Sequence, residues 1–268
     1  YKDFERLSNV AQRECVLFLS TPFDLESARF LSDLVPAFKI ASGDNNFFPL
    51  IDVVARTGKP IILSAGITDL DQIRAARDYI YRIWDEEKKC SELVLLYCVV
   101  DYPTSPADAN LLFIRELQRL GVTVGYSDHT TGIEAAVLSV ALGARIIEKH
   151  FTISKKYSAF RDHQLSADPQ DFAEMVQQIK RTLKFLGDGV KRPLECEKAS
   201  NINVRRSIVA NRDLRAGSII RWEDLNWVRP GDGLSPGKED KVIGMSLKRE
   251  VKVGEKIALE DLVMQREG

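Results

Sequence analysis

Short apolar runs alternate with segments of helical periodicity through the first two thirds of the chain, and this alternation constrains the fold most. The predicted strands cover residues 16–19, 38–40, 60–63, 93–100, 122–124 and 144–147. The run 93–100 is apolar on both faces, which is typical of a parallel strand covered by helices. Six βα units are therefore predicted, with right-handed crossovers and a last helix over 169–186. Residues 2–12 predict a further amphipathic helix before the first strand.

A doubly wound sheet and a (β/α)₈ barrel both generate this pattern, and the polar residues favour the barrel. Polar or glycine-containing segments follow every predicted strand, at residues 20–21, 42–44, 64–66, 101–102, 127–129 and 150–152. A barrel spreads its chemistry around the carboxyl ends of all its strands, whereas an open sheet concentrates it at a switch point. No G-x-G-x-x-G or P-loop motif occurs. We expect an α/β fold of the TIM-barrel type.

The character of the chain changes after Gly187. Residues 188–204 lack apolar periodicity and are predicted to be a linker. Short strand-like pieces separated by glycines fill residues 205–268, which predicts a small, mostly β second domain after a barrel domain at 1–187.

Charge and composition limit the partners. The 38 basic and 39 acidic residues give a net charge of −1, so no broad nucleic-acid footprint is expected. No apolar run is long enough to span a membrane. The four cysteines show no C-x-x-C spacing, which fits a reducing cytoplasm. The chain begins at Tyr1 rather than Met, and we expect it to begin inside a longer protein.

Two of the three histidines, His129 and His150, end consecutive predicted strands. Neighbouring parallel strands lie about 4.8 Å apart, so both imidazoles can converge on one divalent cation. Two imidazoles leave coordination positions for water and substrate. Glu148 shares a face with His150 and can orient it or act as an acid, while Asp128 is a second acidic neighbour. The alternative is that each histidine caps a helix or lies hydrogen-bonded in the core.

Hydroxyl groups at strand ends, such as Ser64, supply donors of the kind that hold a phosphate, and Lys39 adds a positive charge. Lys39 and Ser42 have opposite strand parity. Both can face one ligand only if the strand ends or bulges between them.

These motifs resemble the sialic acid synthase (N-acetylneuraminate synthase) family. The resemblance lies in Leu19-Ser-Thr-Pro-Phe, Phe38-Lys-Ile-Ala-Ser-Gly-Asp, Pro60-Ile-Ile-Leu-Ser-Ala-Gly, Gly125-Tyr-Ser-Asp-His-Thr and Glu148-Lys-His-Phe-Thr. The tail is similar to the SAF (antifreeze-like) domain of that family, through Arg206-Ser-Ile-Val-Ala and Trp227-Val-Arg-Pro-Gly-Asp-Gly.

The resemblance implies a metal-dependent condensation of phosphoenolpyruvate with an open-chain N-acylamino sugar, giving a nonulosonic acid and phosphate. His129 and His150 would hold Mn²⁺ or Mg²⁺, and Glu148, Lys39 and Tyr102 would be catalytic. Residues matching the phosphoenolpyruvate and sugar sites are Thr21, Lys39, Ser42, Ser64, Ser127, Tyr102 and Asp162. Arg229 matches an arginine that the SAF domain of a partner subunit sends over the barrel mouth, which implies a domain-exchanged homodimer.

Two departures from the family pattern matter. The segment 16–19 matches the third strand of the family barrel, so two strands and the active-site acid and lysine they carry are absent. Val100 stands where the family usually has a polar residue, which leaves the amino sugar open. Three alternatives are a legionaminic- or pseudaminic-type synthase, an aldolase with a Schiff-base lysine at Lys39 or Lys149, and an inactive carbohydrate-binding or assembly protein.

Overall fold

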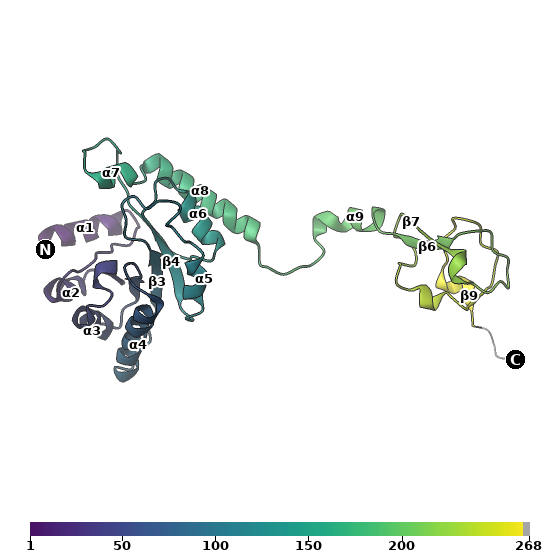
Figure 1. The fold of residues 1–268 in the computed structure, drawn as a ribbon, viewed down its shortest axis with the longest axis horizontal. Helices are drawn as coiled ribbons and strands as arrows, with labels where there is room; N and C mark the ends of the chain where they lie inside the picture. The colour runs from purple at the N-terminus through teal and green to yellow at the C-terminus, as the bar shows by residue number, and fades with distance from the viewer. Residues whose placement is uncertain (265–268) are drawn as a thin grey trace. The chain divides into compact units, whose positions relative to one another are not determined.

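The computed structural model describes residues 1–264, and the chain divides into two compact units, Tyr1–Asp188 and Gly189–Gly268 (Figure 1). The strands of the first unit are β1 (Phe38–Ile40), β2 (Ile61–Ser64), β3 (Leu93–Cys98), β4 (Thr123–Asp128) and β5 (Ile147–Lys149). Its helices are α1 (Lys2–Arg13), α2 (Leu25–Leu31), α3 (Phe48–Arg56), α4 (Leu70–Glu86), α5 (Phe113–Gln118), α6 (Glu134–Ala141), α7 (Arg161–Leu165) and α8 (Pro169–Leu186).

The order of the strands decides between the two fold classes. All neighbouring strands are parallel, and the sheet runs β1-β2-β3-β4-β5 with no reversal. A doubly wound sheet reverses its order at a switch point, whereas successive right-handed crossovers in one direction place every helix on one face. Figure 1 shows α2 to α6 in succession around the strands. The barrel-type prediction is confirmed, as a curled half-barrel of five strands.

An ion pair across the sheet shows how strongly it curls. Lys39 lies on β1 and Glu148 on β5, the two outer strands, yet Lys39 Nζ is 3.4 Å from Glu148 Oε2. Four strand spacings in a flat sheet separate the outer strands by about 19 Å, which these two side chains cannot bridge. The inner face is therefore concave, and its side chains point toward one another.

Alternation along each strand separates the two faces. Phe38, Ile61, Leu95, Val124 and Tyr126 belong to the main hydrophobic core beneath the helices. The residues of opposite parity, which line the concave face, are Lys39, Ile62, Ser64, Leu96, Cys98, Ser127 and Glu148.

Several helix boundaries follow from local chemistry. The carboxylates of Asp24, Asp69 and Asp168 accept bonds from the first-turn N–H groups of α2, α4 and α8. Pro169 begins α8, and the predicted range 169–186 is confirmed.

The first predicted strand is wrong. Residues 16–19 form no strand, and Leu17 is 79% exposed. β1 is an edge strand of the sheet, and within residues 1–264 no strand pairs with its outer edge. The apolar run 16–19 therefore makes no strand hydrogen bonds there. The predicted strand 38–40 is confirmed with its limits unchanged. The limits of the other four strands shift by up to four residues, most for 122–124, which becomes Thr123–Asp128.

The second unit contains two antiparallel pairs, β6 (Ser207–Ala210) with β7 (Leu225–Val228) and β8 (Ser246–Leu247) with β9 (Leu262–Val263). A short helix, α9 (Lys198–Asn203), lies within the predicted linker. The predicted domain limits at 187 and 205 stay predictions.

An internal repeat organises this unit. Residues 212–225 (RDLRAGSIIRWEDL) recur as residues 249–262 (REVKVGEKIALEDL). The structure repeats with the sequence: Arg212 Nε lies 2.7 Å from Asp224 Oδ1, and Arg249 Nε lies 2.7 Å from Asp261 Oδ1. The equivalent residues Leu214 and Val251 exchange both backbone hydrogen bonds, as expected at a local two-fold axis.

Candidate active site

The two strand-end histidines lie side by side on the concave face. His129 follows β4 and His150 follows β5, and the pairs Ser127–Glu148 and Asp128–Lys149 are in register immediately before them. Their ring centres are 5.4 Å apart. The two imidazoles are therefore neighbours, as predicted from their strand ends, and their binding of one cation stays a prediction.

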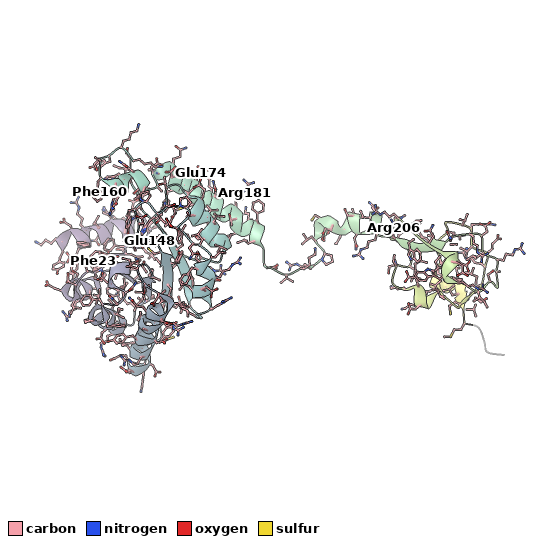
Figure 2. The ribbon with its side chains drawn as sticks, viewed as in Figure 1. Phe23, Glu148, Phe160, Glu174, Arg181 and Arg206 are labelled. Carbon is pink, nitrogen blue, oxygen red and sulfur yellow. The ribbon has the colours of Figure 1, made fainter. Side chains whose placement is uncertain are left out.

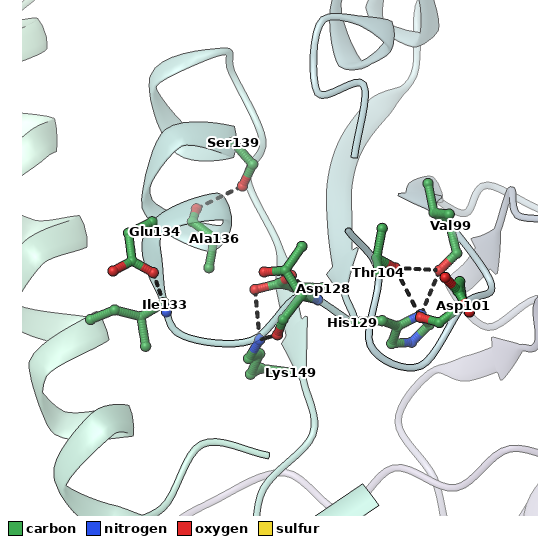
Figure 3. Close-up of polar contacts among 11 residues, drawn as sticks. Val99, Asp101, Thr104, Asp128, His129, Ile133, Glu134, Ala136, Ser139 and Lys149 are labelled. Carbon is green, nitrogen blue, oxygen red and sulfur yellow. Dashed lines mark hydrogen bonds and ion pairs between the residues drawn. The ribbon is translucent and has the colours of Figure 1, made fainter. Parts of the chain in front are cut away.

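A backbone carbonyl fixes the orientation of the His129 ring. Nδ1 of His129 lies 2.7 Å from the carbonyl oxygen of Val99, which can only accept, so Nδ1 carries the proton (Figure 3). Cys98 Sγ lies 3.8 Å from the same nitrogen. Burial lowers the pKa of His129, which favours the neutral ring. Nε2 of the neutral ring is left with a free lone pair, as a metal ligand requires.

Tyr102 packs against both histidines. Its ring centre lies 4.2 Å from that of His129 and 5.6 Å from that of His150. The guanidinium of Arg161 lies over the Tyr102 ring, 5.2 Å from its centre. Burial raises the pKa of Tyr102, so the phenol stays neutral and can donate a hydrogen bond.

Glu148 links the histidines to the floor of the concave face. Its Oε1 accepts a hydrogen bond of 2.6 Å from Ser127 Oγ, and its Oε2 pairs with Lys39. Figure 2 shows Glu148 in the interior of the first unit. The Glu148 side chain is 44% exposed, whereas that of Lys39 is 11% exposed. Ser127 and Lys39 therefore fix the position of the Glu148 carboxylate, which remains exposed enough to contact a ligand or solvent water.

Two serines extend the polar floor toward β1 and β2. Ser64 ends β2, and its Oγ is buried with no hydrogen-bond partner among the residues described. The Oγ of Ser42 accepts a bond of 3.1 Å from Gly66 N–H. The parity conflict between Lys39 and Ser42 disappears because β1 ends at Ile40 and a 3₁₀ turn begins at Ser42.

Asp128 lies on the opposite face from the histidine site. It shares parity with Tyr126 and pairs with Lys149 at 2.9 Å, with side chains 0% and 1% exposed. Its role as an acidic neighbour of the imidazoles is therefore indirect. The Lys149 ammonium pairs with Asp128 on the helix side of the sheet, so it cannot form a Schiff base with a ligand at the concave face.

Three predicted site residues are not joined to this cluster. No hydrogen bond or ion pair within residues 1–264 connects Thr21 to it, and Thr21 lines a separate cavity of about 480 Å³ with Phe4, Phe23 and Phe30. Asp162 lies in the first turn of α7, near enough to act on the Tyr102 hydroxyl electrostatically, but makes no direct bond to it. Arg229 belongs to the second unit, and its approach to a barrel mouth stays a prediction.

Sequence reasoning missed several supporting groups. The Val99 carbonyl gives no side-chain signal at all. Asn45 donates from Nδ2 to the Gly66 carbonyl at 2.9 Å and accepts from Gln72, so it fixes the loop after β2. The place of Asn45 directly after the Ser42–Asp44 turn is the only sequence hint of this role.

The histidine pair fits a divalent cation. A nitrogen about 2.1 Å from a cation puts its ring centre about 3.2 Å away, so two rings at angles of about 90–110° have centres about 4.6–5.3 Å apart. The observed 5.4 Å is close to this range. The described residues contain no set of three or more His, Cys, Asp or Glu side chains able to hold a metal.

A half-barrel with histidines, a carboxylate, a lysine and hydroxyls at one end of its strands defines a barrel enzyme with its site at the carboxyl ends of the strands. The NeuB family profile matches residues 1–191, and the SAF domain profile matches residues 205–263. The chain belongs to the NeuB family. This family comprises metal-dependent synthases of sialic, legionaminic and pseudaminic acid that form a carbon–carbon bond between phosphoenolpyruvate and a sugar.

Individual relatives carry different product names. The N,N'-diacetyllegionaminic acid synthase of Campylobacter jejuni is 38% identical over 232 residues, which cover 85% of this chain and 68% of that protein. The pseudaminic acid synthase of the same organism is 35% identical over 259 residues, 95% of this chain and 73% of the other. The crystal structure of a sialic acid synthetase from Leptospira borgpetersenii, in complex with citrate, superimposes with a TM-score of 0.68 at 36% identity, covering 74% of this chain and 68% of that one.

Across residues 1–264, no helix is both long and apolar enough to cross a bilayer.

Proposed function

We propose that this chain carries the site at which phosphoenolpyruvate condenses with an open-chain N-acylamino sugar and water to give a nonulosonic acid and inorganic phosphate. The observation that carries the proposal is the convergence of His129, His150 and Glu148 with Lys39 on one concave face. Lys39 comes from β1, His129 follows β4, and Glu148 and His150 belong to β5 and its carboxyl end. Together they supply the positive charge, the metal-ligating nitrogens and the carboxylate that this reaction needs.

The anionic substrate needs positive charge and donors. Lys39 offers an ammonium group inside the barrel, and Ser64 offers a buried hydroxyl whose hydrogen-bonding capacity is unused. An unpaired buried hydroxyl is unfavourable, so a ligand oxygen at Ser64 would restore a bond that the free protein lacks. We assign Lys39, Ser42, Ser64 and Ser127 to phosphoenolpyruvate, and Thr21 by resemblance alone.

The sugar aldehyde becomes an alkoxide when the enol carbon attacks it. A divalent Mn²⁺ or Mg²⁺ ion held by His129 and His150 would supply Lewis-acid stabilisation of that oxygen. The hydroxyl of Tyr102, beside both rings, can donate to the same oxygen or to a neighbouring sugar hydroxyl. Asp162 and Arg161 border this side of the site.

Glu148 is the group placed to handle protons. Its carboxylate accepts from Ser127 and pairs with Lys39, and it is open enough to meet water. In our proposal it takes a proton from the water that adds to C2 of the oxocarbenium-like intermediate. The resulting hemiketal phosphate then expels inorganic phosphate and leaves the ketone.

The amino sugar is open between two classes. The family relatives include synthases named for legionaminic and for pseudaminic acid at nearly equal identity, so a 2,4-diacetamido sugar competes with N-acetylmannosamine. The test incubates the chain with phosphoenolpyruvate, Mn²⁺ and either sugar class, and measures phosphate release and product mass. Release with one class and none after His129→Ala is expected. Its absence with every sugar, from a protein that binds both phosphoenolpyruvate and Mn²⁺, would support the inactive-homologue alternative.

We also propose that the active form is a homodimer in which Arg229 of one copy serves the barrel of the other. Mixing two inactive variants and measuring the recovered activity tests this arrangement. Arg229→Ala and His129→Ala variants, each inactive alone, should recover about a quarter of the wild-type rate after mixing and subunit exchange, since a statistical heterodimer has one intact site. An active monomer would exclude the arrangement.

A further inference from the structure

A buried ion pair, Asp128 with Lys149, lies behind the histidines. Asp128 and Lys149 are the last in-register pair of β4 and β5, and each directly precedes one of the two histidines. Both side chains are excluded from solvent, on the helix side of the sheet. Neither contacts the concave face, so the reaction proposed above does not use them.

Thr130 joins the pair into a closed set of bonds. Asp128 Oδ1 accepts from Thr130 N–H at 2.9 Å and from Thr130 Oγ1 at 2.8 Å, while Oδ2 accepts from Lys149 Nζ. Lys149 Nζ also donates to the Thr130 carbonyl at 2.5 Å. His129 is therefore held between two anchored residues, and Figure 3 shows Asp128 and Lys149 joined on one side of it with Thr104 on the other.

Backbone hydrogen bonds from neighbouring segments hold the two histidines as well. Thr104 N–H donates to the His129 carbonyl at 3.0 Å, and Ala167 N–H donates to the His150 carbonyl at 2.8 Å. Each histidine backbone is thus fixed on its outer side by one backbone hydrogen bond. Behind the histidines, the Lys149 side chain links the two strand ends through two partners, the Asp128 carboxylate and the Thr130 carbonyl.

Stability is a poor reason for such a pair. Removing two charges from water is costly, and well-packed apolar residues of similar volume are often as stable or more stable. Fixed geometry is a better reason, because two charges that satisfy each other permit fewer relative positions than two apolar side chains do.

We propose that Asp128 and Lys149 are positioning residues that set the separation of the His129 and His150 rings for one divalent cation. The proposal rests on the proposed function in that it requires the histidine pair to bind metal. It differs from that function in the residues it assigns, none of which touches metal or substrate.

The experiment measures binding of Mn²⁺ alone, by the electron paramagnetic resonance signal of the free ion, to the full chain and its variants. The key variant is the double substitution Asp128→Leu with Lys149→Met, which removes both charges and keeps an apolar volume. Partners of this kind typically change metal affinity by about 10- to 100-fold, so a rise in Kd of that size is expected with the melting temperature nearly unchanged. Excess Mn²⁺ should restore turnover, because a positioning defect weakens binding more than chemistry.

Thr130→Val is the second variant, since it removes one bond to Asp128 and leaves the charges paired. A rise in Kd of several-fold is expected even if the double variant does not fold. Ser139→Ala is the matched control. Among residues 1–264, this buried hydroxyl on α6 bonds to the Ala136 carbonyl alone, and its loss should leave the Kd unchanged.

The outcomes separate the two proposals. Unchanged Kd values in folded double and Thr130→Val variants would overturn the positioning role and leave the metal site standing. No Mn²⁺ binding by the wild-type chain would overturn the metal site and the positioning role together. Equal weakening by Ser139→Ala would reduce the effect to general destabilisation and would also overturn the positioning role.

Discussion

Gly125 lies on β4 beside the start of β5, and replacing it by alanine tests whether strand spacing controls the site. A Cβ atom at this position would lie 2.4 Å from the Ile146 carbonyl oxygen and 2.4 Å from Leu96 Cδ2. The leucine can change its rotamer, but the carbonyl belongs to the backbone beside β5. Because ordinary contacts begin near 3.4 Å, the two strands must separate by about 1 Å.

The magnitude follows from that shift. Overpacking of this kind costs about 1–3 kcal/mol. In a unit of this size each kcal/mol lowers the melting temperature by about 2–4 °C, so a fall of about 2–12 °C is expected. His129 and His150 follow these two strands by only a few residues, and a misplacement of about 1 Å can reduce turnover about 10²-fold.

Calorimetry and a phosphate-release assay measure the two effects separately. Gly43→Ala is the matched control, because its Cβ would meet nothing within 4 Å and its backbone is not in the left-handed region. A Gly125→Ala protein that melts within a degree of the wild type would refute the predicted clash. Normal turnover in spite of a lowered melting temperature would refute the link between strand spacing and the histidine pair.

Three further perturbations test other parts of the argument. Because burial lowers the pKa of His129 below its usual 6.5, this imidazole binds a proton more readily in the unfolded chain than in the folded one. The free energy of unfolding should therefore fall as the pH drops from about 7 to 5. Thermal denaturation of His129→Gln should show a smaller fall over the same pH range. Lys39→Met should reduce kcat/KM for phosphoenolpyruvate about 10²-fold in steady-state assays, whereas Lys155→Met on the surface should not; equal losses would remove Lys39 from the anion site. In the second unit, Arg249 forms two bonds to Asp261 and one to Glu255, whereas Arg212 forms one to Asp224, so Arg249→Ala should lower its melting temperature more than Arg212→Ala; the reverse order would contradict the contact geometry.

The sequence predicts the barrel topology and the histidine pair because both depend on local periodicity. Alternating apolar runs specify parallel strands, and a histidine after each of two consecutive strands meets its partner by register alone. The run at 16–19 has the same local pattern and forms no strand, because a strand also needs a neighbour to pair with, and periodicity does not report one. Thr21 follows that run, so the error in the strand carries over to the predicted position of Thr21.

Side-chain direction explains the remaining differences at the site. Asp128 and Glu148 are both acidic and both near a histidine in sequence, but β4 and β5 alternate, so the carboxylates point to opposite faces. Glu148 lies two residues before His150, so it shares the face of that histidine and forms part of the polar floor. Asp128 lies one residue before His129, so it points to the helix side and pairs with Lys149. This parity means that neutralising Glu148 should change the chemistry at fixed metal affinity, whereas neutralising Asp128 together with Lys149 should change metal affinity at fixed chemistry. Turnover at saturating Mn²⁺ distinguishes the two, because only the Asp128 and Lys149 defect is reversed by added metal.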